Sequence, residues 1–290
     1  MSLKGARVLL TGGTGFIGSH VARLLTHKNV GADVRLLVRP SSRGDALGPL
    51  WDALPRLAAD LDDPGSLAAA VKACDPEYVL HLAKPRDGAS FDREARATTA
   101  LAASLAAGAP RMKRWVRTAH AASDAHGRGA DAALARALAS RFRLDVVTLE
   151  LFLVYGPGQR AGEFPRGLAE AAIAGRPVEI PAEAKDMVHV LDAAEAYRLA
   201  ALDPRAAGKW IPIGGGALVP GTDVARAAVR AAGRPVTDVV PPRADPFHGG
   251  HPADLRAARE ILDWAPSITV DEGMAQLVQW LRDPSRSAGG

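Results

Sequence analysis

Four side chains of types that carry out acid–base chemistry lie close together in the middle of the chain: His120, Asp124, His126 and Arg128. A histidine can transfer a proton near neutral pH, a carboxylate such as Asp124 or Glu150 can orient its ring, and a guanidinium can stabilise an oxyanion. Together these groups could protonate an oxygen on which negative charge develops. The alternative interpretation is that both histidines are structural residues with hydrogen-bonded rings.

A glycine-rich loop near the N-terminus has the spacing of a phosphate-binding turn. The segment TGGTGFIG, residues 11–18, follows an apolar run at 6–10 and opens an amphipathic helix. Glycines in this context permit a tight turn and a close approach of the backbone to a pyrophosphate, which the N-terminus of the helix binds. The pattern predicts a dinucleotide cofactor that is held by Gly12, Thr14, Gly15, Phe16, Ile17 and Gly18.

The end of the second predicted strand indicates which dinucleotide is bound. A site for NAD usually carries a carboxylate there for the 2′-hydroxyl of the ribose, whereas a 2′-phosphate is matched by an arginine. The strand 33–38 ends at Val38 and is followed by Arg39, while Asp33 lies at its opposite end. We therefore expect NADP, and NAD is the alternative if Arg39 is only a solvated loop residue.

The elements that must position these residues alternate along the chain. Helical segments, notably 92–107 and 130–142, separate short β-rich runs at 6–10, 33–38, 77–83, 114–119 and 144–152. Near-continuously apolar strands between helices are typical of a parallel sheet that is covered on both faces. The expected fold class is α/β, a doubly wound parallel sheet of the Rossmann type with a smaller C-terminal substrate-binding region.

Composition bounds the domain organisation. The 290 residues are 48% hydrophobic and 23% charged, which is typical of a globular chain with a large core. Glycine and proline become frequent after Tyr155, so we expect a cofactor domain over 1–155 and a substrate-binding region over 156–185 and 216–290. The segments 188–202 and 209–214 could return to the main sheet, so that 186–215 would belong to the first domain.

Several other classes of protein are not expected. The net charge is +4, but the arginines are scattered among acidic residues, which argues against a nucleic-acid partner. The single cysteine, Cys74, excludes an intrachain disulfide, and His248 and His251 have no neighbouring third ligand, so no metal is expected. No apolar run is long enough to span a bilayer and no signal peptide is evident, so we expect a cytoplasmic protein without a membrane partner.

Motifs spread over almost the whole chain resemble those of the extended short-chain dehydrogenase/reductase family, the nucleotide-sugar epimerases, dehydratases and reductases. They are TGGTGFIG at 11–18, DLDD at 60–63, HLAK at 81–84, LVYGPGQ at 153–159, KDMVHVLDAAEA at 185–196 and AREILDWAP at 258–266. The resemblance implies further cofactor contacts at Asp60, Leu61, Leu82, Ala83 and Lys84, and substrate contacts at Leu153 and Lys185.

The chain departs from this family at the catalytic residues. The family uses a tyrosine, a lysine four residues later, and a serine or threonine at the end of the preceding strand. None of the three tyrosines, Tyr78, Tyr155 and Tyr197, has a lysine four residues on. We therefore expect any catalysis to use a different proton donor.

Other side chains occupy the matching positions. Asp124 stands for the tyrosine and Arg128 for the lysine, while His120 or, with a slip of one residue, Ala119 stands for the serine or threonine. On the substrate side, the resemblance places Glu150 where the family commonly has arginine, Leu153 where it often has asparagine, and Lys185 where it has the arginine that meets nucleotide phosphates.

Two functions from different classes fit these observations. The first is an NADP-dependent oxidoreductase, ketoreductase-like or epimerase-like, that acts on a nucleotide sugar or another carbonyl-bearing small molecule, with His120 as proton donor and Arg128 or Lys84 as cationic support. The second is a catalytically silent NAD(P)-binding sensor, scaffold or partner subunit. We favour the enzyme, because a chain that had lost catalysis would not need to keep so many polar groups together. The resemblance also implies a homodimer formed through the helices 92–107 and 130–142.

Overall fold

The computed structural model describes residues 2–84, 91–121, 125–241 and 250–283, except for the side chains of 125–127. The chain forms two compact units. The first unit comprises 1–150, 194–211 and 260–264, and the second comprises 151–193, 212–259 and 265–290. We describe each unit separately.

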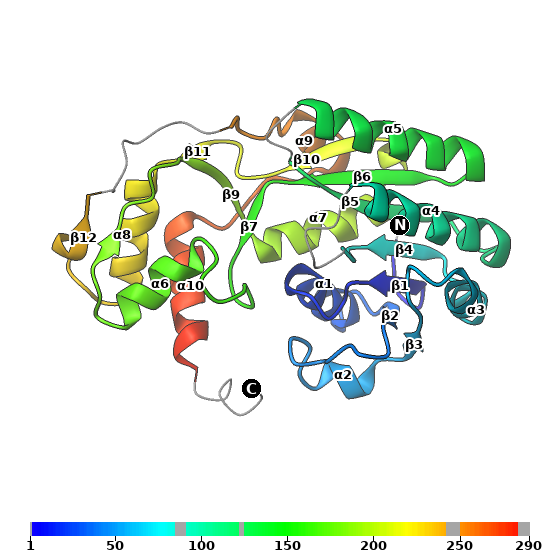
Figure 1. Cartoon of the computed structure of the whole chain (residues 1–290), viewed down its shortest axis with the longest axis horizontal. Helices are drawn as coiled ribbons and strands as arrows, with labels where there is room; N and C mark the ends of the chain where they lie inside the picture. Colours follow the sequence, from blue (N-terminus) through cyan, green and yellow to red (C-terminus); the bar gives the residue numbers. More distant parts are fainter. Residues whose placement is uncertain (1, 85–90, 122–124, 242–249, 284–290) are drawn as a thin grey trace. The chain divides into compact units, whose positions relative to one another are not determined.

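The first unit is built on a seven-stranded sheet of order β10-β6-β5-β4-β1-β2-β3 (Figure 1). The pairs β1–β2, β1–β4, β2–β3 and β4–β5 are parallel. The strand order reverses at β1, which confirms the expected doubly wound Rossmann fold. The strands are β1 (Arg7–Thr11), β2 (Asp33–Val38), β3 (Arg56–Ala58), β4 (Tyr78–His81), β5 (Arg114–His120), β6 (Val146–Leu151) and β10 (Trp210–Ile213).

Helices cover this sheet through a core of aliphatic residues and one tryptophan. Trp115 of β5 and Val79 of β4 are fully buried with Leu67, Leu101 and Leu138, which come from three different helices. Apolar residues at helical spacing therefore bury α3, α4 and α5 against the strands. The helices of this unit are α1 (Phe16–Thr26), α2 (Leu50–Ala53), α3 (Pro64–Cys74), α4 (Phe91–Gly108), α5 (Ala125–Phe142) and most of α7 (Val190–Leu202), with a 3₁₀ turn at Pro204–Ala206.

The second unit has smaller sheets and shorter helices. Its core is formed by Tyr155, Met187, Val224, Met274 and Leu277. One sheet has the order β11-β9-β7, and a two-stranded sheet joins β12 to β8. The elements are β7 (Leu153–Tyr155), α6 (Arg166–Ile173), β8 (Val178–Glu179), β9 (Lys185–His189), β11 (Leu218–Val219), α8 (Gly221–Ala231), a 3₁₀ turn at Val236–Asp238, β12 (Val239–Val240), the first part of α9 (Arg256–Leu262) and α10 (Val270–Arg282).

Two segments that the sequence left ambiguous differ in their placement. Residues 210–213 form β10 beside β6 in the main sheet. Residues 185–189 instead form β9 of the small sheet, and the helix α7 follows directly. Residues 194–202, which form most of α7, belong to the first unit together with β10, whereas β9 belongs to the second. Within the described residues, no helix is both long and apolar enough to cross a membrane.

Candidate cofactor and catalytic site

The glycine loop lies so close to the end of β4 that a side chain on Gly12 would clash with it. Gly12 has φ of +72°, and a Cβ atom there would lie 2.6 Å from the backbone nitrogen of Ala83. A Cβ atom on Gly18 would lie 2.1 Å from the carbonyl oxygen of Gly12, so α1 starts directly on the loop. These glycines form a cradle that any side chain would fill, and such a cradle fits a pyrophosphate.

The first turn of α1 has donors to offer such a group. Its N-cap residue is Gly15, no side chain caps the helix, and no acidic residue lies in the first turn. The partial positive charge of the N-terminus therefore stays available to an anion. Thr14, Phe16 and Ile17 are half-buried around this turn.

Arg39 follows β2 as an exposed side chain. Among the described residues it has no ion-pair partner, and its carbonyl accepts the N–H of Ser42 at 2.9 Å. Asp33, at the other end of the strand, is paired with Arg35 at 3.1 Å and with Arg7 at 3.7 Å. Within the described residues, the carboxyl end of β2 is thus followed by a guanidinium, while the carboxylate of this strand lies at its other end.

Two of its own polar side chains organise the segment after β3. The Asp60 carboxylate accepts the N–H of Asp62 at 3.0 Å, and the N–H of Asp60 donates to the Ser66 hydroxyl at 3.3 Å. Leu61 is half-buried beside it. Both residues expected on the adenine side therefore lie in an ordered turn between β3 and α3.

Hydrogen bonds fix the end of β4 to the glycine loop. The buried ring of His81 lies with Nδ1 2.7 Å from the Thr11 hydroxyl, which accepts the N–H of Ala83 at 3.2 Å. Burial, with the charges of Arg117 and Lys84, lowers the pKa of His81 to about 3. His81 is therefore a neutral structural residue, and it orients the segment Leu82–Lys84 beside the cradle.

Lys84 ends this segment with a partly exposed ammonium group. Its Nζ lies 3.5 Å from the Glu94 carboxylate at the start of α4. The ammonium is close enough to His120 to lower the pKa of that imidazole. Lys84 can therefore contribute positive charge near the end of β5, and the Glu94 carboxylate partly neutralises this charge.

Buried tyrosines do not replace the missing catalytic tyrosine. The hydroxyl of Tyr197 lies 2.6 Å from that of Thr118, which donates to the carbonyl of His81 at 2.9 Å. Tyr155, in the second unit, donates to the carbonyl of Thr269 at 3.3 Å. Burial raises the pKa of both phenols well above the ordinary value of 10.

His120 ends β5 as an exposed side chain, and its environment changes its chemistry. The surrounding protein desolvates the ring and Lys84 opposes a second positive charge, so the pKa falls to about 4 although Asp131 acts in the other direction. A ring that solvent reaches can still be crowded by protein atoms at longer range. These surroundings favour the neutral imidazole near neutral pH, and the role of His120 as proton donor stays a prediction.

Two members of the predicted cluster are not defined as side chains. Asp124 lies outside the described residues, and His126 lies in the first turn of α5, where the backbone alone is described. The catalytic roles of His120, Asp124, His126 and Arg128 stay predictions.

Arg128 is held by a buried carboxylate. Its Nε donates to Oε1 of Glu150 at 2.7 Å, and the indole Nε1 of Trp210 donates to Oε2 at 3.0 Å. The Glu150 side chain is fully buried, whereas that of Arg128 is 40% exposed. Among the described side chains, Glu150 therefore anchors Arg128, and a role in orienting the ring of His126 stays a prediction.

A second ion pair joins α5 to the sheet, and the sequence analysis missed it. Arg117 of β5 is 1% exposed and lies 2.5 Å from the carboxylate of Asp131. The only signal was an arginine inside the apolar strand segment RWVRTA. In the Arg117–Asp131 pair the strand carries the positive charge, whereas in the Arg128–Glu150 pair the strand carries the negative charge.

The predicted substrate residues belong to the second unit. Leu153 packs on the core of that unit, and Nζ of Lys185 lies 2.5 Å from the Glu183 carboxylate. His189 is fully buried and packs edge-on against Tyr155, with the ring centroids 5.5 Å apart. Leu153 and Lys185 therefore have different surroundings, one apolar and one ionic.

No metal site is evident in the part of the chain that the structure describes. No group of three or more histidine, cysteine or carboxylate side chains lies close enough there to hold an ion. His251 is exposed and packs edge-on against Phe152 at 5.8 Å between ring centroids, while His248 lies outside the described residues.

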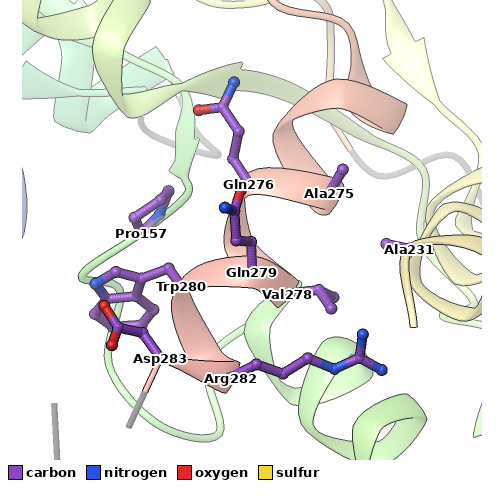
Figure 2. Close-up of a pocket in the computed structure, with 9 residues that line it drawn as sticks. All are labelled: Pro157, Ala231, Ala275, Gln276, Val278, Gln279, Trp280, Arg282 and Asp283. Carbon is purple, nitrogen blue, oxygen red and sulfur yellow. The ribbon is translucent and has the colours of Figure 1, made fainter. Parts of the chain in front are cut away.

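A shallow pocket of about 700 Å³ lies along α10 in the second unit (Figure 2). Gln276, Gln279 and Trp280 line it together with Pro157 and Arg282. None of the side chains that we predicted to contact cofactor or substrate is among its lining residues. It therefore provides no support for the predicted site.

Comparison with known proteins identifies the family from most of the chain. The model of the NAD dependent epimerase/dehydratase family matches residues 8–126 and 128–214. The chain belongs to this family. The match confirms the resemblance drawn from the motifs, and it supports the interpretation that the protein is an NAD(P)-dependent enzyme of the oxidoreductase and epimerase type.

Individual relatives agree with this assignment. A UDP-glucose 4-epimerase of Mycolicibacterium smegmatis is 27% identical over 97% of this chain and all of its own length. Among solved structures, a UDP-glucose 4-epimerase of Thermotoga maritima with UDP-glucose has a TM-score of 0.79 at 22% identity and covers 95% of this chain and 98% of its own. The enzyme WbmF of Bordetella bronchiseptica, in complex with NAD⁺ and UDP, has a TM-score of 0.78 at 21% identity, over 97% of this chain and 93% of its own. At this identity the structural matches show the fold.

We predict that Asp131→Ala strongly destabilises the protein. The change leaves the Arg117 guanidinium buried without its counter-ion, which costs about 3–5 kcal/mol of unfolding free energy. Chemical denaturation followed by circular dichroism measures the loss. The matched control is Asp52→Ala, because Asp52 is 87% exposed and its 3.7 Å pair with Arg56 lies at the surface, so its loss should cost below about 1 kcal/mol. Equal losses for the two variants would contradict the importance of the buried pair.

Proposed function

We propose that the protein is an NADP-dependent oxidoreductase that acts on a carbonyl group of a nucleotide sugar or a related small molecule through a non-standard acid site. The observation that carries the proposal is the arrangement at the carboxyl ends of the parallel strands. The glycine cradle follows β1. Arg39, which has no ion-pair partner among the described residues, follows β2 on one side, and on the other side Lys84 follows β4 and His120 ends β5. Ligands bind in this crevice in folds of this type.

The strand order supports a direction for the cofactor. The phosphates belong at the cradle, so one nucleotide extends over β2 and the other over β4 and β5. Arg39 is on the β2 side, where it would bind the 2′-phosphate of the adenosine half. The half that undergoes redox chemistry then lies on the side of Lys84 and His120. NAD stays the alternative, and NAD⁺ is the cofactor named for WbmF.

The chemistry we infer uses His120 in its neutral form. The cofactor would supply or accept the hydride. A neutral imidazole can donate an N–H hydrogen bond to the carbonyl oxygen and so stabilise the negative charge that develops on it. Because the ring is exposed, it can pass the required proton from solvent to the resulting alkoxide. Lys84 adds positive charge near this position.

The substrate class rests on the relatives and on one side chain. The named relatives act on or are solved with uridine nucleotides or their sugars. Lys185, as the counterpart of the family's phosphate-binding arginine, would meet a diphosphate, and a lysine does so as a point charge. We therefore propose a nucleotide sugar first and another carbonyl compound second.

A catalytically silent NAD(P)-binding protein is the second candidate. It is favoured by the depressed pKa of His120 and by the engagement of Arg128 with Glu150. Such a protein would bind the cofactor without transferring hydride to any substrate. Turnover therefore separates the two candidates, whereas cofactor affinity does not.

We predict that NADPH binds more tightly than NADH and that Arg39→Ala removes the difference. The guanidinium can form charge-assisted hydrogen bonds with the 2′-phosphate, and loss of one such contact costs about tenfold in affinity. Titration of both cofactors with tryptophan fluorescence as the readout measures the ratio. Arg43→Ala, which changes an exposed arginine of the same loop, is the control. Equal affinities in the unmodified protein would refute NADP specificity.

We predict that His120→Ala lowers kcat by about 10² to 10⁴-fold and leaves the Kd for NADPH unchanged. With a pKa of about 4, the imidazole stays neutral at higher pH. The plot of rate against pH should therefore show no inflection from His120 between about pH 5.5 and about pH 8. Steady-state rates with a panel of UDP-sugars and ketones, measured by NADPH absorbance, test both statements. The exposed His27→Ala is the control. A limb near pH 6.5 that disappears in His120→Ala would contradict the neutral form, and no turnover with any substrate would favour the silent protein.

We also infer a homodimer, in the cytoplasm, through the outer faces of α4 and α5. A depression of about 880 Å³ lies there, lined by small side chains of α4 such as Ala95, Ala103 and Ala107, with Phe142 from α5. Small residues permit close helix packing, and a two-fold contact is the commonest way to cover such a face. Light scattering should give twice the chain mass of 30.3 kDa, and Ala103→Arg should give the monomer. A monomeric mass for the unmodified protein at micromolar concentration would rule out this dimer.

A further inference from the structure

We propose that Glu150 is a positioning residue that holds Arg128 by its Nε, so that the rest of the guanidinium binds the redox-active half of the dinucleotide. Trp210 completes the anchor. This inference rests on the proposed binding of NADP and goes beyond it, because it assigns a task to a carboxylate where the family resemblance led us to expect an arginine.

The carboxylate is fixed from two sides. Glu150 lies near the end of β6 and is fully buried, and each of its oxygens accepts one hydrogen bond. One donor comes from α5 and the other from β10. A buried carboxylate without partners would be strongly destabilising, so the two donors hold its orientation.

The anchored arginine keeps most of its donors. Within the described part of the chain the only hydrogen bond of its side chain runs from Nε, so Nη1 and Nη2 have no partner there. The side chain is 40% exposed. A guanidinium is planar and carries five N–H donors, so a bond through Nε fixes its plane and leaves the two Nη groups for ligand oxygens.

The helix that carries Arg128 is itself fixed. Asp131 lies one helical turn further along α5 and is paired with the buried Arg117 of β5. Residues three apart lie on the same face of a helix. Both ion pairs therefore tie the same face of α5 to neighbouring strands, which restricts rotation of the helix and of Arg128 with it.

The strand order indicates which half of the dinucleotide lies near Arg128. Neighbouring strands are about 4.8 Å apart, so β6, three strands from β1 in the sheet, lies about 14 Å from the glycine cradle. Arg39 and β2 are on the opposite side of β1. A dinucleotide with its phosphates at the cradle and its adenosine half over β2 therefore extends its other half toward Arg128. The hydroxyl groups of that ribose are acceptors of the kind that the Nη groups can bind.

The test compares two ligands that differ in this half. NADPH carries the nicotinamide nucleotide, whereas adenosine 2′,5′-bisphosphate carries only the adenosine half with its 2′-phosphate. We expect Glu150→Gln to raise the Kd of NADPH by about tenfold, the equivalent of one charge-assisted hydrogen bond. The Kd of adenosine 2′,5′-bisphosphate should stay within about twofold, which is within the range of an indirect effect. Fluorescence titration measures both, and circular dichroism checks the fold.

Arg128→Gln keeps the test decisive if Glu150→Gln does not fold. The glutamine amide can still donate to Glu150, but it lacks the Nη groups, so the same selective loss of NADPH affinity is expected. Arg136→Gln is the matched control, because Arg136 is an exposed arginine of the same helix and the change in charge is identical. Trp210→Phe adds a spectroscopic readout. We expect the fluorescence change that NADPH causes to shrink in this variant, since the indole is bonded to the anchor.

The outcomes separate this inference from the proposed function. If the unmodified protein binds neither ligand, the proposed cofactor is wrong and the inference falls with it. If both ligands bind and Glu150→Gln and Arg128→Gln weaken them equally, the role of Glu150 is merely structural and the inference alone is overturned. It is also overturned if neither variant changes the Kd of NADPH, because Arg128 then does not contact the cofactor.

Discussion

Helix α5 is held to the sheet by two ion pairs whose sheet partners are both buried, and the position of Arg128 depends on this attachment. Arg117 and Glu150 would each be strongly destabilising without a counter-ion. Their partners, Asp131 and Arg128, lie one turn apart on the helix. Such pairs need not add stability relative to an apolar interface, but they fix which helical face meets the sheet.

The same attachment explains how the site differs from that of the family that the chain resembles. The side chain in the position of the family's lysine is an arginine, and the carboxylate beneath it stands where the family commonly has an arginine. The two changes are complementary, because a lysine could not donate to Glu150 and keep a planar pair of donors for a ligand. With the low pKa of His120, they fit the proposed site, in which hydrogen bonds from fixed groups would replace a titrating tyrosine.

The sequence predicted the parts of the fold that follow from local patterns. The strand 33–38 coincides with β2, and the glycine loop lies between β1 and α1 as expected, because apolar runs and glycine turns determine these features locally. The short β3 and the start of α5 at Ala125 were not predicted. Their patterns are weak, since β3 has only three residues and the early part of α5 carries Arg128 and Asp131, whose charged partners lie on other elements.

Other features of the site depend on residues that are distant in the sequence. The pKa of His120 follows from crowding and from Lys84, and neither can be inferred from the strand in which the histidine occurs. Glu150 accepts hydrogen bonds from Arg128 and Trp210, which lie 22 and 60 residues away from it in the sequence. An arginine in an apolar strand and a glutamate in the next were visible in the sequence, but their partners could be found only from the folded chain.

A crystal structure of the protein with NADPH bound would test the central claim most directly. The account predicts that Arg128 keeps its Nε on Glu150 and that its Nη groups lie within hydrogen-bond distance of the ribose on the nicotinamide side. It is contradicted if Arg128 leaves Glu150 to reach the cofactor, or if the guanidinium stays on Glu150 and makes no contact with the bound dinucleotide.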